Sequence, residues 1–344
     1  MTQKRTSTRD IAAAAGVSQA TVSNVLSGRS RLPIAEATRQ RVLQTAEELR
    51  YRPNRLAAGM FRGKTSMIGV ILPDVGGSFY GDMLRGIQHA CMMEDCVTLL
   101  SYTQSDARSE EQEANRLLEH RVDGLLVAVS RYTLAGTSVW LDDMRVDGIP
   151  CVMLDDRSYS PKMDVVASDD VDGAYQAVKH LTDLGHRRIA FISGPEGLTT
   201  FRDRQLGYEK ALAECGIELD PALVTRSEWD YNDSPITPWL ANLLASPNRP
   251  TALFAVSDYH AEVVIRWMRS EGLSVPGDLS VVGYAGTELS KGLDLTTVHQ
   301  DSYNIGLTAA SRLFHRTHAS SPQPTEVLLP TWLIVRKSSG PALI

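Results

Sequence analysis

Residues 7–26 read STRDIAAAAGVSQATVSNVL, and this stretch decides the interpretation of the chain. Ser7 and Asp10 have the spacing of a capping box ahead of an apolar run, which predicts the start of a helix. Gly16 ends that helix after two turns, and Ser18 can cap a second one. Two short helices joined by a tight turn form a helix-turn-helix, whose second helix can lie in the DNA major groove. The alternative is a plain helical hairpin with a polar outer face.

A third helix completes the small head. The pattern predicts it from Glu36 to about Arg50, with Val42, Ala46 and Leu49 facing inward. Pro53 ends it, because proline disfavours helix in the residue before it. Residues 54–64 contain good helix formers but are too few to be helical alone in water. They are expected to form a linker whose helicity depends on a partner.

The charge is divided unevenly along the chain. Residues 1–64 contain 12 Lys+Arg and 4 Asp+Glu, whereas the remaining residues contain 23 and 37. The head therefore carries +8 and the remainder −14, which sum to the net charge of −6. A basic head on an acidic body is typical of a protein that meets a polyanion at one end. A chance distribution of surface charge is the alternative.

From Met67 onward, strand-like runs alternate with amphipathic helical segments. This alternation predicts parallel sheets with helices on both faces, and the continuously apolar strands indicate sheets buried on both sides. Two such sheets fit the length, and a small ligand is expected between them at the carboxyl ends of the strands. The expected strands are Met67–Pro73, Val97–Tyr102, Val122–Val129, Cys151–Leu154, Arg188–Ser193, Thr251–Ser257 and Leu279–Tyr284. The expected helices are Asp82–Glu94, Glu110–His120, Val171–Leu184, Gln205–Cys215 and Ala261–Gly272.

The sequence shows no sign of catalysis, of a cofactor or of a metal site. It lacks the HExxH, GxGxxG, P-loop and GxSxG motifs. Its cysteines, Cys91, Cys96, Cys151 and Cys215, form no CxxC pair and lie near no histidine at metal-ligand spacing. No apolar run reaches the ~18 residues that span a bilayer, and the basic first residues lead into no signal peptide. We therefore expect a cytoplasmic protein that is not an enzyme and binds no cofactor, metal or membrane.

The head and body together resemble the LacI/GalR family of bacterial repressors. The landmarks of the resemblance in the head are Asp10–Ala12, Ala15–Ser18, Ala20–Ser23, Thr38-Arg39 and Tyr51–Asn54. Those in the body are Ile68–Val70, Val122–Leu125, Gly185–Ile189, Gly207-Tyr208, Val275-Pro276 and Val281–Tyr284. They occur in family order over nearly the whole chain. The resemblance implies an all-α helix-turn-helix head and an α/β body of two doubly wound, parallel-sheet subdomains similar to periplasmic sugar-binding proteins.

The resemblance also implies domain boundaries. The DNA-binding head is expected at 1–53, a hinge helix at 54–64, and an effector-binding and dimerisation domain at 65–344. Within the latter, the N-subdomain would take about 65–167 plus 300–327. The C-subdomain would take about 168–299 plus 328–344.

The expected DNA contacts follow from the motif and the resemblance. Gln and Asn can read adenine, Ala can meet a thymine methyl, and hydroxyls suit phosphates. In this family a hinge side chain wedges a base step in the minor groove, and Met60 occupies that position. Two residues depart from the family pattern. Gly59 is a poor helix former in the hinge, and Ala35 stands where a residue that caps the third helix is usual. The expected DNA-contact residues are Thr8, Ser18, Gln19, Ala20, Thr21, Ser23, Asn24, Tyr51, Asn54, Ala57 and Met60.

The effector site is implied by the family positions in the body. Arg204 would hold sugar hydroxyls or a carboxylate, and Trp229 would stack on a sugar face. The family usually has Asp where this chain has Ala285, so either the effector is unusual or Thr287 or Glu288 compensates. The expected effector contacts are Phe79, Ser101, Arg204, Trp229, Asp258 and Thr287. The alternatives are a surface salt bridge for Arg204, a core position for Trp229 and a helix N-cap for Asp258.

Taken together, these features predict a homodimeric, repressor-like transcription regulator associated with the bacterial nucleoid. It would bind pseudo-palindromic double-stranded operator DNA and respond to a small-molecule effector. A carbohydrate is favoured, and a nucleobase-type ligand is the alternative. A solute-binding sensor or transport protein without a DNA role is the alternative function, for which the basic head would be superfluous.

Overall fold

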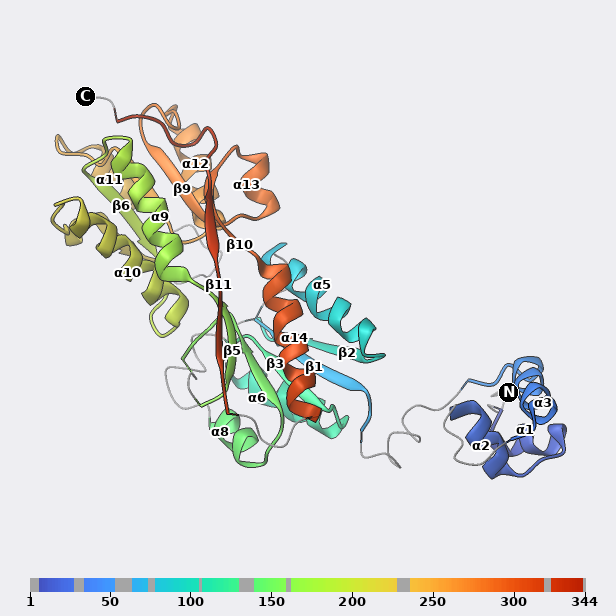
Figure 1. Cartoon of the computed structure of the whole chain (residues 1–344). Helices are drawn as coiled ribbons and strands as arrows, with labels where there is room; N and C mark the ends of the chain where they lie inside the picture. The colour runs from blue at the N-terminus through green and yellow to red at the C-terminus, as the bar shows by residue number, and fades with distance from the viewer. Residues whose placement is uncertain are drawn as a thin grey trace. The chain divides into compact units, whose positions relative to one another are not determined.

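The computed structural model describes residues 6–27, 34–52, 64–73, 78–104, 107–129, 139–158, 162–227, 236–318 and 323–342. The chain divides into two compact units, Met1–Thr65 and Ser66–Ile344. We call them the head and the body and describe each by itself (Figure 1). Among the described residues, no helix is long and apolar enough to cross a membrane.

The head contains α1 (Thr8–Ala15), α2 (Gln19–Ser27) and α3 (Glu36–Glu48). Both halves of the expected capping box are present on α1, and Gly16 ends the helix with a φ of 66°. Glycine suits this left-handed conformation because it has no Cβ to clash. The three helices bury a small common core of Ile11, Ala12, Ala15, Val22, Val25, Val42 and Ala46.

Two expectations for α3 have clear outcomes. No side-chain hydrogen bond caps its start at Ala35, as the departure from the family pattern predicted. Leu49 was expected to face inward, and this is wrong, because the helix ends at Glu48 and Leu49 is 37% exposed. The helical periodicity no longer applies to a residue beyond the last turn.

The first subdomain of the body is a six-stranded sheet in the order β11-β5-β4-β3-β1-β2. Its strands are β1 (Met67–Leu72), β2 (Val97–Tyr102), β3 (Gly124–Val127), β4 (Cys151–Leu154), β5 (Asp164–Ser168) and β11 (Glu326–Leu329). Two helices, α5 (Ser78–Met93) and α14 (Ser302–His318), pack on one face. The other face is covered by α6 (Ala107–Glu119) and α8 (Val139–Val146). The apolar runs of the inner strands are buried on both sides, as predicted.

The second subdomain repeats this layered plan with the order β12-β10-β9-β8-β6-β7. Its strands are β6 (Ile189–Ser193), β7 (Val224–Arg226), β8 (Ala252–Ala255), β9 (Ser280–Ala285), β10 (Thr296–Gln300) and β12 (Thr331–Ile334). One face carries α9 (Asp170–Asp183) and α10 (Thr199–Glu214), and the other carries α11 (Ile236–Leu244) and α12 (Asp258–Ser270). The short elements η1 (Pro221–Leu223) and α13 (Glu288–Gly292) complete it.

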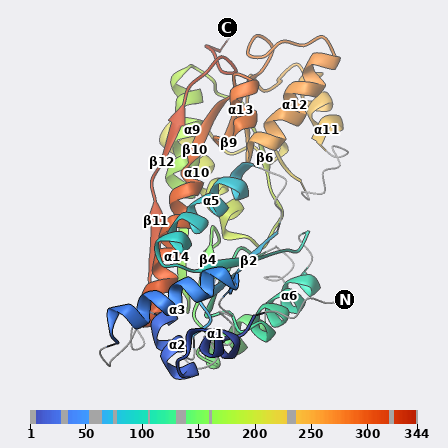
Figure 2. The ribbon, with the colours of Figure 1, turned by 90° about the vertical axis from the view of Figure 1, so that its right-hand side faces the viewer.

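The element order takes the chain between the two sheets three times, after β5, after β10 and after β11. These crossovers are hydrogen-bonded to one another. The Asp169 N–H donates to the Leu329 carbonyl over 2.9 Å, and Gln300 Nε2 donates to Ser168 Oγ over 3.0 Å. β11 and β12 continue along one edge of the body, as the view in Figure 2 shows. The crossovers thus form one connected joint between the subdomains.

All seven predicted strands are present, and the predicted fold class is confirmed. The strands β5, β7, β10, β11 and β12 were not predicted, and several other details differ from expectation. β2 lies at the sheet edge and is partly exposed rather than buried on both sides. β12 runs antiparallel to β10 in the otherwise parallel second sheet. Helix α10 begins at Thr199, six residues before the predicted start.

Candidate functional site

The expected DNA-contact residues in the head gather on the outward side of α2. Gln19, Ala20 and Ser23 are exposed, whereas Val22 and Val25 of the same helix are buried in the head core. The apolar side of α2 therefore faces the head core, and its polar side is free to enter a DNA groove. That is the side from which a recognition helix reads base edges.

Hydroxyl groups organise the start of α2. Ser18 Oγ accepts the Thr21 N–H over 3.1 Å and lies 2.8 Å from Thr21 Oγ1. Ser18 therefore caps the start of α2, as the sequence predicted. The side chain of Gln19 reaches α1, where its Nε2 donates to Thr8 Oγ1 over 2.8 Å. Two residues predicted separately as DNA contacts are thus joined to each other.

The remaining predicted DNA contacts differ in their exposure to solvent. Asn24 is half-buried on α2, and Tyr51 is half-buried after α3, packed against the head core. Three hinge predictions and one effector prediction lie outside the described residues: Asn54, Ala57, Met60 and Trp229.

In the body, Arg204 lies at the subdomain junction, which we define as Asp155–Arg157, Ser168–Asp170, Thr199–Arg204 and Gln300. Arg204 is 4% exposed, so it is not a surface salt bridge. Its Nε lies 2.9 Å from Asp170 Oδ1, Nη1 donates to the Val256 carbonyl over 2.8 Å, and Nη2 donates to Gln300 Oε1 over 3.1 Å. The guanidinium also covers the ring of Tyr284 at 3.8 Å, a favourable cation–π geometry.

Two carboxyl groups face this single arginine. Burial raises the pKa of Asp170, while the charge of Arg204 opposes part of that effect. Burial also raises the pKa of Asp155 well above its usual value, and the charge of Asp170 adds to the rise. Burial disfavours charged carboxylates, and Arg204 is the cation that compensates them. The junction is therefore a polar, electrostatically coupled site inside an apolar body.

Asp258 and Thr287 are brought together by the structure. Asp258 Oδ2 accepts from the backbone N–H and the hydroxyl of Thr287 over 2.7 and 2.8 Å, and Oδ1 accepts from Thr297 Oγ1 over 2.5 Å. Gly283 makes room for the carboxylate, because an added Cβ would lie 2.6 Å from Asp258 Oδ1. The alternative interpretation of Asp258 as a helix N-cap is wrong, because Ser257 caps α12 and its Oγ accepts the His260 N–H over 3.3 Å.

The family usually has Asp at the position of Ala285, and the surrounding contacts show whether Thr287 or Glu288 is placed to replace that carboxylate. Thr287, one candidate substitute, already donates to Asp258. Glu288, the other, is exposed and pairs with Lys291 over 2.5 Å. Ala285 itself has a φ of 115° and is followed by Gly286 at 68°, so the backbone after β9 turns sharply. An effector that uses this loop would have to compete with these internal bonds.

Phe79 and Ser101, the remaining predicted effector contacts, lie in the first subdomain. Phe79 is half-buried on α5 and meets Tyr80 edge to face, with 5.2 Å between ring centroids. Ser101, near the end of β2, donates to Glu113 Oε2 over 2.8 Å. No contact between these two residues and Arg204 or Asp258 is seen among the described residues.

The residues immediately after β4 were missed by the sequence reasoning. Asp156 is 4% exposed, and its Oδ2 accepts from Thr199 N and Thr199 Oγ1 over 2.7 and 2.9 Å. Arg157 Nη1 lies 3.5 Å from Asp203 Oδ2. Their position directly after a predicted strand could have identified them, because ligands bind beyond the carboxyl ends of strands in such folds.

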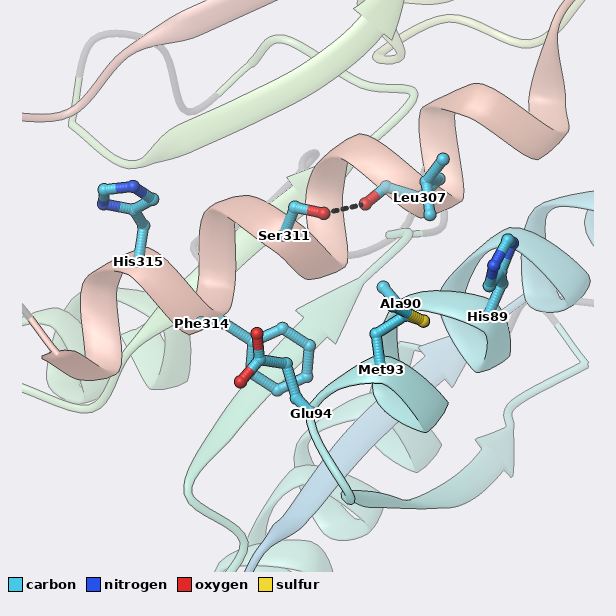
Figure 3. A pocket seen from close by; sticks show the side chains of 8 residues that line it. All are labelled: His89, Ala90, Met93, Glu94, Leu307, Ser311, Phe314 and His315. Carbon is cyan, nitrogen blue, oxygen red and sulfur yellow. Dashed lines mark hydrogen bonds between the residues drawn. The ribbon is translucent and has the colours of Figure 1, made fainter.

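A separate groove lies between α5 and α14, with a volume of about 350 Å³ (Figure 3). It is lined by His89, Ala90, Met93, Glu94, Leu307, Ser311, Phe314 and His315. None of the predicted effector residues lines this groove. Among the described residues, no three His, Cys, Asp or Glu side chains are grouped so as to hold a metal ion.

Comparisons with known proteins agree with this arrangement. The family model for bacterial regulatory proteins of the lacI family matches residues 7–54, and that for a periplasmic binding protein-like domain matches residues 178–339. The HTH-type transcriptional regulator DegA of Bacillus subtilis is 32% identical over 339 residues, covering 98% of this chain and 99% of DegA.

Two solved structures extend the comparison. The lac repressor dimer bound to operator and the anti-inducer ONPF has a TM-score of 0.84 at 28% identity, covering 97% of this chain and 99% of that one. The complex of the transcriptional regulator CelR with cellobiose has a TM-score of 0.71 at 28% identity, covering 97% and 100%. Fold and sites define a transcription regulator with a DNA-binding head and an effector-binding body. The chain belongs to the LacI family of bacterial transcription regulators.

Proposed function

We propose that this protein is a repressor that binds a pseudo-palindromic operator as a homodimer. A small-molecule effector, a sugar or sugar derivative, would bind at the subdomain junction and set the affinity for DNA. The protein would act in the bacterial cytoplasm, at the nucleoid. One observation chiefly supports the proposal. The same chain has a basic helix-turn-helix head and a body whose two subdomains meet around Arg204.

The chemistry of α2 supports base recognition. A glutamine amide offers a donor and an acceptor that together match adenine in the major groove, and an alanine methyl suits thymine. Gln19 and Ala20 are exposed side by side at the start of α2. Ser18, Thr21, Ser23, Asn24, Tyr51 and Asn54 would supply the surrounding contacts, with Ala57 and Met60 in the hinge. Thr8 would lie beside Gln19 at this surface, bonded to its side chain. The excess of positive charge in residues 1–64 would add attraction for phosphates.

An exposed apolar patch supports self-association. On α5 and the neighbouring edge strand β2, Met92 is 79% exposed and Met93 77%, Val97 48%, Leu100 43% and Tyr102 51%. Large apolar side chains exposed on neighbouring elements are typical of contact sites, and the sheet edge at β2 adds open backbone groups. A second copy of this chain would cover the patch and bring two heads to the two halves of an operator.

The junction supports a polar effector. Three of the five N–H groups of Arg204 have partners among the described residues, which leaves part of the planar donor fork for ligand oxygens. Phe79, Ser101, Trp229, Asp258 and Thr287 would complete the site as the ligand draws the subdomains together. The sugar class is supported by the cellobiose bound to CelR, a relative of the same fold. A ligand that prefers one subdomain arrangement would shift the population of DNA-binding conformers.

The proposal is tested by operator selection followed by an effector screen on the full chain. Selection from a random DNA library should give a two-fold symmetric site, and a sugar panel should contain a compound that raises the melting temperature. That compound should change operator affinity by about 5- to 150-fold, the usual range of allosteric coupling. Selection of no DNA sequence would contradict the repressor assignment. A hit from another chemical class would contradict only the sugar.

The place of the effector is tested with a charge-balanced variant. Arg204→Gln combined with Asp170→Asn removes both charges of the buried pair, so neither is left unpaired. This variant should bind operator normally and lose the effector response. The matched control is Arg187→Ala, which removes an exposed arginine of the same subdomain that donates to the Cys215 carbonyl. A normal response in the double variant would place the effector elsewhere.

A further inference from the structure

The hydrogen bond between Gln19 and Thr8 links two side chains that lie 11 residues apart, on different helices of the head. Gln19 is exposed at the first position of α2, and Thr8 is half-buried at the first position of α1. Gln19 Nε2 is the donor and Thr8 Oγ1 the acceptor, over 2.8 Å. Because the bond joins the recognition helix to the helix before it, the Gln19 side chain has a support outside its own helix.

The accepting hydroxyl is itself held in place. Thr8 follows Ser7, whose backbone N–H donates to Asp10 Oδ2 over 2.8 Å in the capping box of α1. The same helix is anchored by Ile11, which is 0% exposed in the head core. Threonine is β-branched, so its χ1 angle has few accessible values in a helix. The acceptor is thus fixed by a capped, packed turn.

This support has a consequence for recognition. A free glutamine must lose side-chain freedom when it binds a base, and that ordering weakens binding. With one Nε2 N–H on Thr8, the second N–H and Oε1 remain, which are the donor and acceptor that a bidentate contact with adenine requires. We propose that Thr8 is a positioning residue that holds the Gln19 amide in its reading orientation before DNA arrives. The proposal rests on the base-reading role proposed for Gln19.

The proposal differs from a direct DNA contact by Thr8. A threonine hydroxyl on a phosphate would add affinity for every DNA sequence equally, because phosphates carry no sequence information. A hydroxyl that orients Gln19 would add affinity only for operators with the preferred base at the position Gln19 reads. The dependence on sequence, and the dependence on Gln19 itself, separate the two roles.

The experiment compares full-length wild type with Thr8→Val, Thr8→Ser, Gln19→Ala and the Thr8→Val/Gln19→Ala double variant on a library of single-base operator changes. Thr8→Val keeps the shape of threonine and removes its hydroxyl. It should weaken binding to the preferred operator by about two- to tenfold, the cost of ordering one long side chain. Base preference should flatten at one position of each half-site. Thr8→Ser should behave as wild type, and Thr8→Val should have no further effect once Gln19 is alanine.

Two controls keep the result interpretable. Thr45→Val removes a hydroxyl that donates to the Arg41 carbonyl of its own helix, and it should leave base preference unchanged. The salt dependence of binding should not change in Thr8→Val, because no phosphate contact is lost. An equal loss on all sequences, persisting in the Gln19→Ala background, would overturn the proposal in favour of a phosphate contact. If Gln19→Ala alone leaves preference unchanged while wild type still selects an operator, the base-reading role fails and the proposal fails with it.

Discussion

The carboxylate of Asp156 accepts two hydrogen bonds from Thr199, one from its backbone N–H over 2.7 Å and one from its hydroxyl over 2.9 Å. Asp156 follows the last β4 residue by two positions in the first subdomain, whereas Thr199 begins α10 in the second. The residue that precedes α10, Leu198, supplies no side-chain cap. The helix is therefore capped from the opposite subdomain, and its stability is coupled to the joining of the two.

Asp156→Ala should destabilise the body by about 1–2 kcal/mol, the usual loss when a helix cap is removed. Asp156→Asn should lose less, because both Thr199 bonds end on Oδ2 and a single amide oxygen in that place can still accept them. The measurement is the melting temperature of the full chain. Equal melting temperatures for wild type and Asp156→Ala would show that the contact adds nothing to stability.

Arg204→Ala should cost about 3–5 kcal/mol, because it leaves the Asp170 carboxylate buried without its cation. Replacing Asp170 by Asn in the same chain should recover much of the loss, since a neutral amide is less costly to bury. Denaturant unfolding of the two single variants and the double variant gives the coupling energy. Additive effects would mean that the pair does not act as a unit.

Gly283→Ala should destabilise the second subdomain by about 1–3 kcal/mol, as overpacked core positions do. The new Cβ would lie 2.6 Å from Asp258 Oδ1 and 2.8 Å from Leu295 Cδ2. Gly292→Ala is the matched control, because an added Cβ there meets no atom within 4 Å. Thermal unfolding should separate the two alanine variants, and similar melting temperatures would contradict the tight packing at Gly283.

Acid should destabilise the body through His260. This residue is 0% exposed, and burial together with the charge of Arg204 lowers its pKa from 6.5 to about 3. The unfolded chain takes up a proton near pH 6.5 and the folded chain only near pH 3. The stability associated with neutral His260 is therefore complete above pH 6.5 and is lost as the pH falls toward 3, by roughly tenfold in the folding equilibrium per pH unit.

The measurement is the pH dependence of unfolding for wild type, His260→Asn and His315→Asn. The His260 variant should show a shallower decline of stability below pH 6.5. His315 is exposed on α14, so its variant should follow the wild type. Parallel curves for all three proteins would exclude His260 as the source of acid sensitivity.

Operator affinity should fall steeply with salt, because the positive charge is concentrated in residues 1–64. Arg9→Gln on the exposed surface of α1 should reduce the slope of log affinity against log salt by about 1 if it meets a phosphate. Arg269→Gln, an exposed change in the body, should leave the slope unchanged. Binding titrations between 50 and 200 mM salt, roughly the range in which phosphate contacts weaken markedly, provide the test. If the operator affinity of the wild type did not change with salt, the positive charge of residues 1–64 would not contribute to DNA binding.

The fold was largely predictable because its signals are local. Ser7, Asp10 and Gly16 lie within ten residues and define α1, and the apolar runs of the inner strands alternate with helices at regular intervals. The candidate site was less predictable because its contacts are not local. Arg204 meets Asp170, Val256 and Gln300, which are 34, 52 and 96 residues away. The early start of α10 depends on Asp156, 43 residues before Thr199, which no helical periodicity can reveal.

His186 illustrates the same limit. It lies within the family landmark Gly185–Ile189, and the neighbouring residues alone indicate no role for it. The structure buries its ring, with Nδ1 2.8 Å from Thr251 Oγ1 and Nε2 2.9 Å from the Gly340 carbonyl. Both partners are distant in sequence, so only the folded chain shows that this histidine ties the C-terminal segment to the second sheet.

The path of the chain near its end has a practical consequence for protein engineering. β11 is the outermost strand of the first sheet and β12 the outermost strand of the second, and only Pro330 separates them. A truncation before Glu326 would therefore strip an edge from both subdomains at once. A single protease cut at any one crossover would leave two backbone links intact, so the halves would stay together as a nicked molecule. Neither subdomain is a continuous segment that can be excised, exchanged between relatives or expressed as one uninterrupted piece.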